Sequence, residues 1–113
     1  MFPRDESWRT DDARALFEAL LLLETPDEVA RLMRDLCTVG ELRDLAQRWA
    51  VVRLLDQGLH YAEIGQRTGA STATITRIAA WLRHGEGGYR LLLDRVKAPP
   101  ATRQRRPGAR RAR

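Results

Sequence analysis

The sequence is poor in features that mark several classes of protein. It has one cysteine, Cys37, which excludes an internal disulfide bond and a metal site made only of cysteines. No apolar run approaches the roughly 18 residues that a transmembrane helix needs. The first residues are acidic and polar, unlike a signal peptide. We therefore expect a cytoplasmic protein without membrane contact, in which Cys37 is a small buried thiol.

Patterns typical of enzymes and of β-sheets are also absent. The sequence has no glycine-rich loop after a strand pattern and no Ser-His-Asp or Cys-His grouping. His60 and His84 lie 24 residues apart without a companion ligand at metal-site spacing, so we expect no metal and no other cofactor. No β-branched or aromatic run alternates with polar residues. These absences predict an all-α protein that is not an enzyme.

The net charge of +5 is distributed unevenly. Residues 97–113 hold seven Lys and Arg and no acid, so residues 1–96 hold 13 bases against 15 acids. Because this tail is too polar to form a core, we expect it to be disordered. It is either an arm that binds nucleic acid or only a solvated end, and the composition leaves both open. The arginines that could contact DNA, or RNA, are Arg103, Arg105, Arg106, Arg110, Arg111 and Arg113.

Apolar residues elsewhere recur every three or four positions, which predicts helices. Thr25 with Glu28, and Thr38 with Glu41, have the spacing of capping boxes at helix starts. We divide the chain into a flexible N-terminus (1–10), a helical domain (11–96) and the tail (97–113). Five of the six expected helices cover residues 11–23, 39–57, 61–68, 72–83 and 89–96. The other one begins at residue 26, and its buried stripe ends at residue 36.

The helix expected over residues 39–57 is apolar on two faces, so it must be buried on several sides. One small subunit offers few neighbours for such a helix, which favours an entwined dimer. The alternative is a compact monomer in which the first two helices wrap around this one. The residues of the two faces are Leu42, Leu45, Ala46, Trp49 and Val52, and Ala50, Val51, Leu54 and Leu55.

Residues 61–80 have the layout of a helix-turn-helix. Gly69 can adopt the positive φ of a sharp turn, and Ser71 can cap the second helix. Gly65 has no side chain, so the two helices can cross closely. The side chains that we expect to clamp them together are Ile64, Ile75, Ile78 and Leu82.

The second helix of this motif would present short polar side chains to the outside, which suits the major groove of DNA. We expect Thr72, Ala73 and Thr76 to contact base edges. We also expect Ala80 to face outward on the same side of the helix. The expected phosphate contacts are Gln66, Ser71, Arg77 and, less strongly, Arg83. Because the motif is nearly neutral, a helical module that binds protein rather than DNA remains the alternative.

Three segments resemble the Trp repressor superfamily, and within it the YerC/YecD branch. They are DLCTVGELRDLAQRW at 35–49, TGASTATITR at 68–77 and GYRLLLDR at 88–95. The resemblance implies a six-helix fold, an intertwined homodimer and a sequence-specific bacterial transcriptional regulator, with repression as the expected mode. Double-stranded DNA would be its partner.

The resemblance also bears on tryptophan as a corepressor. Arg48 and Arg77 fall at the places of the two arginines that hold the amino acid in the Trp repressor. Ile78 and Trp81 stand where that protein has a glycine and a serine that leave room for the ligand. We expect both bulky side chains to point inward and fill the space. The protein would then act without tryptophan, and any other small effector is undetermined.

Overall fold

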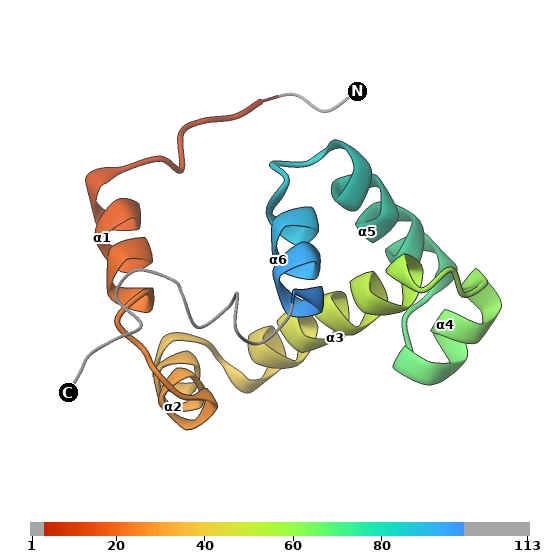
Figure 1. Ribbon diagram of the computed structural model, residues 1–113, viewed down its shortest axis with the longest axis horizontal. Helices are drawn as coiled ribbons and strands as arrows, with labels where there is room; N and C mark the ends of the chain where they lie inside the picture. Colours follow the sequence, from red (N-terminus) through yellow and green to blue (C-terminus); the bar gives the residue numbers. More distant parts are fainter. Residues whose placement is uncertain (1–3, 99–113) are drawn as a thin grey trace.

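The computed structural model describes residues 4–98, and this part of the chain is all-helical. Figure 1 shows the six helices in order along the chain. The all-α class is confirmed, while the tail arginines lie outside the described residues. The helices are α1 (Asp11–Leu20), α2 (Pro26–Leu36), α3 (Val39–Asp56), α4 (Tyr61–Thr68), α5 (Thr72–His84) and α6 (Gly88–Lys97).

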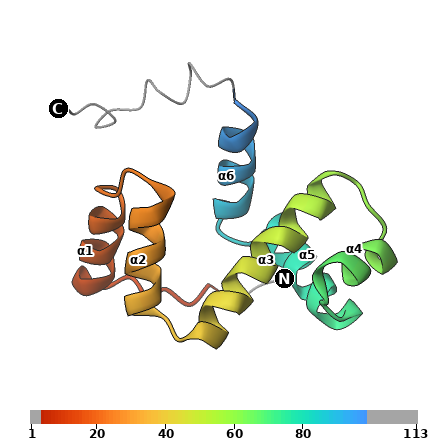
Figure 2. The same cartoon turned by 90° about the horizontal axis from the view of Figure 1, so that it is seen from below.

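The core lies around the C-terminal half of α3. Val51 and Val52 of α3 are fully buried, and α4, α5 and α6 each add aliphatic side chains to the same cluster. Figures 1 and 2 show α4 and α5 at one end of α3 and α1 with α2 at the other. Both apolar faces predicted for α3 therefore contribute to this cluster, the first through Val52 and the second through Val51. The buried cluster consists of Val51, Val52, Ile64, Ala70, Ile75, Ile78 and Leu93.

Helices α1 and α2 contain no residue that is buried within the single chain, so the stripe predicted to be buried on α2 is not covered by one subunit. Val29 is 40% exposed and Leu36 is 52% exposed. The reason is that α1 and α2 do not wrap around α3, as the monomeric alternative required, but lie together beyond its N-terminal end (Figure 2). Cys37, at the end of α2, is only partly buried rather than buried as expected.

Two features predicted near the N-terminus differ in the structure. Helix α1 ends at Leu20 rather than at residue 23, since the following N–H groups bond three residues back and tighten the chain into a turn. At α2, the Thr25 hydroxyl accepts the Glu28 N–H at 3.1 Å as predicted. The Glu28 carboxylate, however, accepts the N–H of Glu24 and not that of Thr25, so this capping box is half formed. The box at Thr38 and Glu41 is confirmed.

The segment before α1 contacts the turn between α5 and α6. Glu86 accepts hydrogen bonds from Arg4 at 2.8 Å and from Arg9 at 3.4 Å. Trp8 packs edge-on against Phe17 of α1, with ring centroids 6.2 Å apart. These groups are exposed, so each ion pair contributes little stability. A flexible N-terminus over residues 1–10 therefore stays a prediction.

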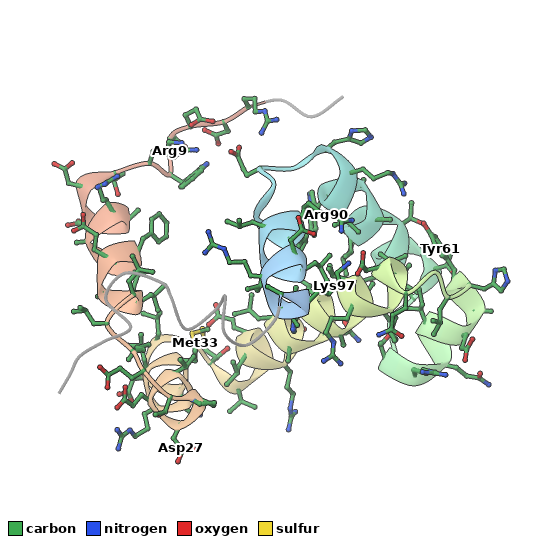
Figure 3. The ribbon with its side chains drawn as sticks, in the orientation of Figure 1. Arg9, Asp27, Met33, Tyr61, Arg90 and Lys97 are labelled. Atoms are coloured by element: carbon green, nitrogen blue, oxygen red, sulfur yellow. The ribbon has the colours of Figure 1, made fainter. Side chains whose placement is uncertain are left out.

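The C-terminal end of α3 is linked to α6 by ion pairs. The Asp56 carboxylate lies 2.9 Å from Lys97 Nζ and 3.1 Å from Arg90 Nη1. Both bases lie on α6, as Figure 3 shows. The hydrogen bond with Lys97, followed by that with Arg90, lowers the pKa of Asp56 below its ordinary value. The pairing thus favours the charged carboxylate in the folded state.

We predict that Gly69→Ala destabilises the protein and that Gly40→Ala does not. Gly69 has φ +78°, and a left-handed conformation costs an L-residue about 1–2 kcal/mol. Gly40 lies in the first turn of α3 with open space around its Cα, so alanine there favours the helix by up to about 1 kcal/mol. Urea unfolding of both variants measures the difference. Equal stability of the two would contradict the role of the turn.

We predict that Asp56→Asn removes part of the acid sensitivity of folding. Because the pKa of Asp56 is lowered in the folded state, its stabilising effect is present above the unfolded pKa of about 3.9 and disappears as the pH falls through the folded value. The wild type should therefore exceed the variant in stability near neutral pH, and the difference should shrink as the pH falls below the unfolded pKa of about 3.9. Thermal unfolding across this range gives the comparison. Asp94→Asn, whose carboxylate approaches Arg90 only to 3.8 Å, is the matched control.

Candidate nucleic-acid interface

The turn between α4 and α5 has the predicted geometry. Gly69 adopts φ +78°, and its N–H donates to the Gly65 carbonyl at 2.8 Å. The Ser71 hydroxyl accepts the Thr74 N–H at 3.1 Å and caps α5. A Cβ on Gly65 would lie 3.1 Å from the Ala70 carbonyl oxygen. Gly65 is therefore the position where the turn comes closest to α4, which confirms the predicted tight crossing.

The inner side of the motif is locked by aliphatic packing. Ile64 of α4 and Ile75 of α5 are fully buried, and Ile78 is 1% exposed. Leu82 packs against this cluster from the last turn of α5 and is partly buried. All four side chains belong to the predicted clamp, so α5 has one defined inner face.

The opposite side of α5 is open to solvent. Thr72, Ala73 and Thr76, the predicted base contacts, are all exposed. Ala80, which was expected to face outward with them, is partly buried because it lies beside the buried Ala79 near the core. The predicted phosphate contacts are exposed as well, and they are Gln66, Ser71, Arg77 and Arg83. Contact of any of these residues with DNA stays a prediction.

Thr74 organises the first turn of α5, although the sequence analysis assigned it no function. Its hydroxyl oxygen accepts a hydrogen bond from Ser71 Oγ at 3.1 Å and one from Arg77 Nη2 at 3.4 Å. The Arg77 guanidinium is thereby held near the N-terminal end of the helix. The spacing of three residues on each side of Thr74 was the signal that could have revealed this arrangement.

Gln47 of α3 is a second residue that sequence reasoning missed. Its side-chain amide donates to the carbonyl oxygen of Thr68, the last residue of α4, at 3.0 Å. The Thr68 hydroxyl in turn donates to the Ile64 carbonyl at 2.8 Å and accepts the Ala70 N–H at 3.2 Å. The turn is thus fixed from α3 and from within. A hydrogen bond over 21 residues has no sequence signal.

The charges near the motif are largely balanced. Arg67 of α4 pairs with Glu63 at 2.7 Å, which leaves less free positive charge on this helix. His60 precedes α4 without a side-chain capping bond, and Tyr61, the first residue of the helix, is 36% exposed. Within residues 4–98, no group of three His, Cys, Asp or Glu side chains could hold a metal ion. In that same stretch, no helix has the length and apolar character to cross a membrane.

The residues of the expected ligand pocket are only partly brought together. Ile78 is buried, as predicted. Trp81 remains 39% exposed, so it does not fill an enclosed space as predicted. The neighbour of Trp81 from α3 is a charged side chain. Arg48 Cζ lies 5.7 Å from the centre of the Trp81 ring. Arg77 is instead engaged by Thr74.

Tyr89 of α6 completes this corner of the molecule. It is partly buried against the core. Burial raises the pKa of the Tyr89 phenol, and the positive charge of Arg48 acts in the opposite direction. Residues of α3, α5 and α6 therefore meet around Arg48.

Comparison with known proteins places this geometry in a family. Residues 11–97 match the sequence model described as Trp repressor protein. The chain belongs to the Trp repressor family. The match spans all six helices and ends at residue 97, where the basic tail begins. The chain is also similar to the uncharacterised protein YerC of Bacillus subtilis (strain 168). This similarity supports the predicted YerC-like branch.

The similarity extends over most of each relative. The B. subtilis protein is 46% identical over 82 residues, which are 73% of this chain and 79% of the relative. The crystal structure of a TrpR-like protein from Eubacterium eligens ATCC 27750 has a TM-score of 0.77 and 36% identity, and covers 81% of this chain and 95% of its own. The crystal structure of a candidate Trp repressor from Staphylococcus aureus has a TM-score of 0.79 and 40% identity. The match covers 87% of this chain and 98% of the S. aureus chain. The six-helix fold is thereby confirmed.

Proposed function

We propose that this protein is a sequence-specific DNA-binding transcriptional regulator that acts as a homodimer in the cytoplasm. One observation carries the proposal: α5 has a locked aliphatic inner face and an exposed outer face of short side chains over its first turns. A helix of this kind enters the major groove without steric conflict. Membership of the Trp repressor family supports the same function and favours repression. We assign the protein no enzymatic activity.

The exposed apolar side chains of α1, α2, α3 and α6 support a homodimer. Many large apolar side chains lie at the surface of the single chain, whereas a stable monomer buries its stripes. On α6, Leu93 packs inside while Leu92 and Val96 are half exposed, so the apolar side chains of this helix are only partly covered within one chain. A second copy would cover these residues. They include Phe17, Leu21, Leu22, Val29, Leu36, Val39, Leu45, Leu91, Leu92 and Val96.

Binding by two heads would offset the weak charge of each one. In this proposal each α5 enters one of two successive major grooves, with Thr72, Ala73 and Thr76 at base edges. Ser71, Gln66 and Arg77 would contact phosphates, assisted by the N-terminal end of the α5 helix dipole. Arg83 and the arginines of the tail would add charge attraction along the backbone.

The second candidate function is a module that binds another protein. The near-neutral charge of the head favours it, because Arg67 is already paired with Glu63. A gel shift with random duplex DNA separates the two candidates. A nucleic-acid binder retards DNA at low salt and loses this effect as salt is added, whereas a protein-binding module retards none.

We predict that selection from a random DNA pool yields two half-sites about 10 base pairs apart. Thr76→Ala should weaken binding to the selected site about tenfold, because it removes one base contact per head. Arg77→Gln should weaken all sequences alike and reduce the slope of log K against log salt by about 1 for each head. Fluorescence anisotropy over a salt series measures both effects.

Arg14→Gln is the matched control for the loss of charge. Arg14 lies on α1, its side chain is 80% exposed, and among the described residues its ion pair is with Glu18 on the same helix. The variant should keep the affinity and the salt slope of the wild type. A selected pool without consensus, or half-sites at an irregular spacing, would argue against specific binding by a dimer.

We also propose that tryptophan is not the corepressor, because Ile78 is buried and the Trp81 indole is already packed against Arg48. Titration calorimetry with L-tryptophan should give no heat of binding at micromolar concentrations. DNA affinity should likewise be unchanged by the amino acid. Micromolar binding would show that Ile78 and Trp81 leave the pocket open.

A further inference from the structure

Two adjacent residues of α3 reach the helix-turn-helix at two separate points. Gln47 donates a hydrogen bond to the carbonyl of Thr68, where α4 ends. Arg48 lies over the ring of Trp81, in the last turn of α5. The contacts therefore lie just before the start of α5 and near its C-terminal end. Figure 1 shows α3 running beside both helices of the motif.

These contacts differ in kind from the aliphatic core between the same helices. Ile64, Ile75 and Ile78 give non-directional attraction, which holds the helices together but specifies their rotation only through shape. The Gln47 hydrogen bond has a preferred angle, and a guanidinium over an indole has a preferred position. Two directional contacts at separate points along the motif fix the axis of α5 more closely than aliphatic packing around the middle of that helix does.

The surroundings of Arg48 and Trp81 indicate that the contact itself matters. Trp81 is 39% exposed although every other large apolar side chain that α5 directs at α3 is at least partly buried. Among residues 4–98, Arg48 forms no ion pair with a carboxylate. Its guanidinium lies over the indole, and its charge also acts on the Tyr89 phenol. The pair also joins two different helices. By contrast, Arg9 lies 4.4 Å from the ring of its own neighbour Trp8, so that pair joins no two helices.

We infer that Gln47, Arg48 and Trp81 are positioning residues that set the angle between α5 and α3 and thereby the sequence specificity of DNA binding. This inference rests on the proposed function. Because the indole belongs to α5 and the guanidinium to α3, the protein holds its recognition helix in place with its own side chains. None of the three needs to touch DNA.

The experiment measures affinity for the selected site and for random DNA, each over a salt series. Trp81→Ala and Arg48→Met should lower affinity for the selected site about tenfold and leave random-sequence affinity unchanged, because only base readout depends on the helix angle. Gln47→Ala should act in the same direction. The salt slope of Arg48→Met should equal that of the wild type, since the slope counts phosphate contacts.

Two comparisons separate positioning from general damage. Trp8→Ala removes an indole of similar exposure that also lies under an arginine, and it should change neither affinity. Trp81→Phe keeps an aromatic face for Arg48 and should retain most of the specificity even if Trp81→Ala folds poorly. Millimolar indole should restore part of the specific affinity of Trp81→Ala by filling the space left by the side chain.

Each outcome has one meaning. Unchanged specificity in folded Arg48→Met and Trp81→Ala overturns the inference while the proposed function stands. A salt slope reduced by about 1 per head in Arg48→Met also overturns it, because Arg48 would then be a phosphate contact. If the wild type binds no duplex at low salt, the proposed function fails and the inference fails with it.

Discussion

The fold depends on the packing of three isoleucines of the helix-turn-helix against the two buried valines of α3. Ile64, Ile75 and Ile78 lie within 1% of complete burial, and Val51 and Val52 are fully buried. This cluster is small, yet it is the place where α3, α4, α5 and α6 all meet. Because β-branched side chains are stiff, the cluster favours one arrangement of the helices. The outer face of α5 is defined by it, since burial of one side leaves the other to solvent.

The N-terminal half of the molecule follows a different rule. Helices α1 and α2 have regular caps and amphipathic stripes, but no side chain in them is buried within the single chain. Secondary structure there is set locally by Thr10, Thr25 and Thr38, whose side chains each accept a backbone N–H. The packing of these helices is not set within one chain, because no side chain of theirs is buried there. This imbalance is the basis of the proposed homodimer.

A further set of polar contacts joins elements that lie far apart in the sequence. Asp56 ties the end of α3 to α6, and Gln47 ties its middle to the turn of the motif. The contribution of such contacts to overall stability is small compared with the core. Their contribution to geometry is larger, since they act at the ends of helices where a small rotation moves the side chains furthest. Specific recognition of DNA needs orientation of this kind more than additional stability.

The sequence by itself determined the local features of this protein. The positions of five helices, the cap at Ser71, the capping box at Thr38 and the left-handed turn at Gly69 were all predictable from residues a few positions apart. The sequence pattern also identified the buried isoleucines, because helical periodicity places them on one face. The exposed residues of α5 follow from the same periodicity, and only their contact with DNA goes beyond it.

Only the tertiary structure decided which distant side chains meet. The bond from Gln47 to Thr68, the pairing of Asp56 with Lys97, and the position of Arg48 over Trp81 span 21 to 41 residues. Trp81 was expected inside because periodicity assigns a face to a residue but does not say how far the neighbouring helix extends. The stripe of α2 was predicted from periodicity as well, and one subunit leaves it uncovered. Amphipathicity is a property of one helix, whereas burial depends on what lies opposite.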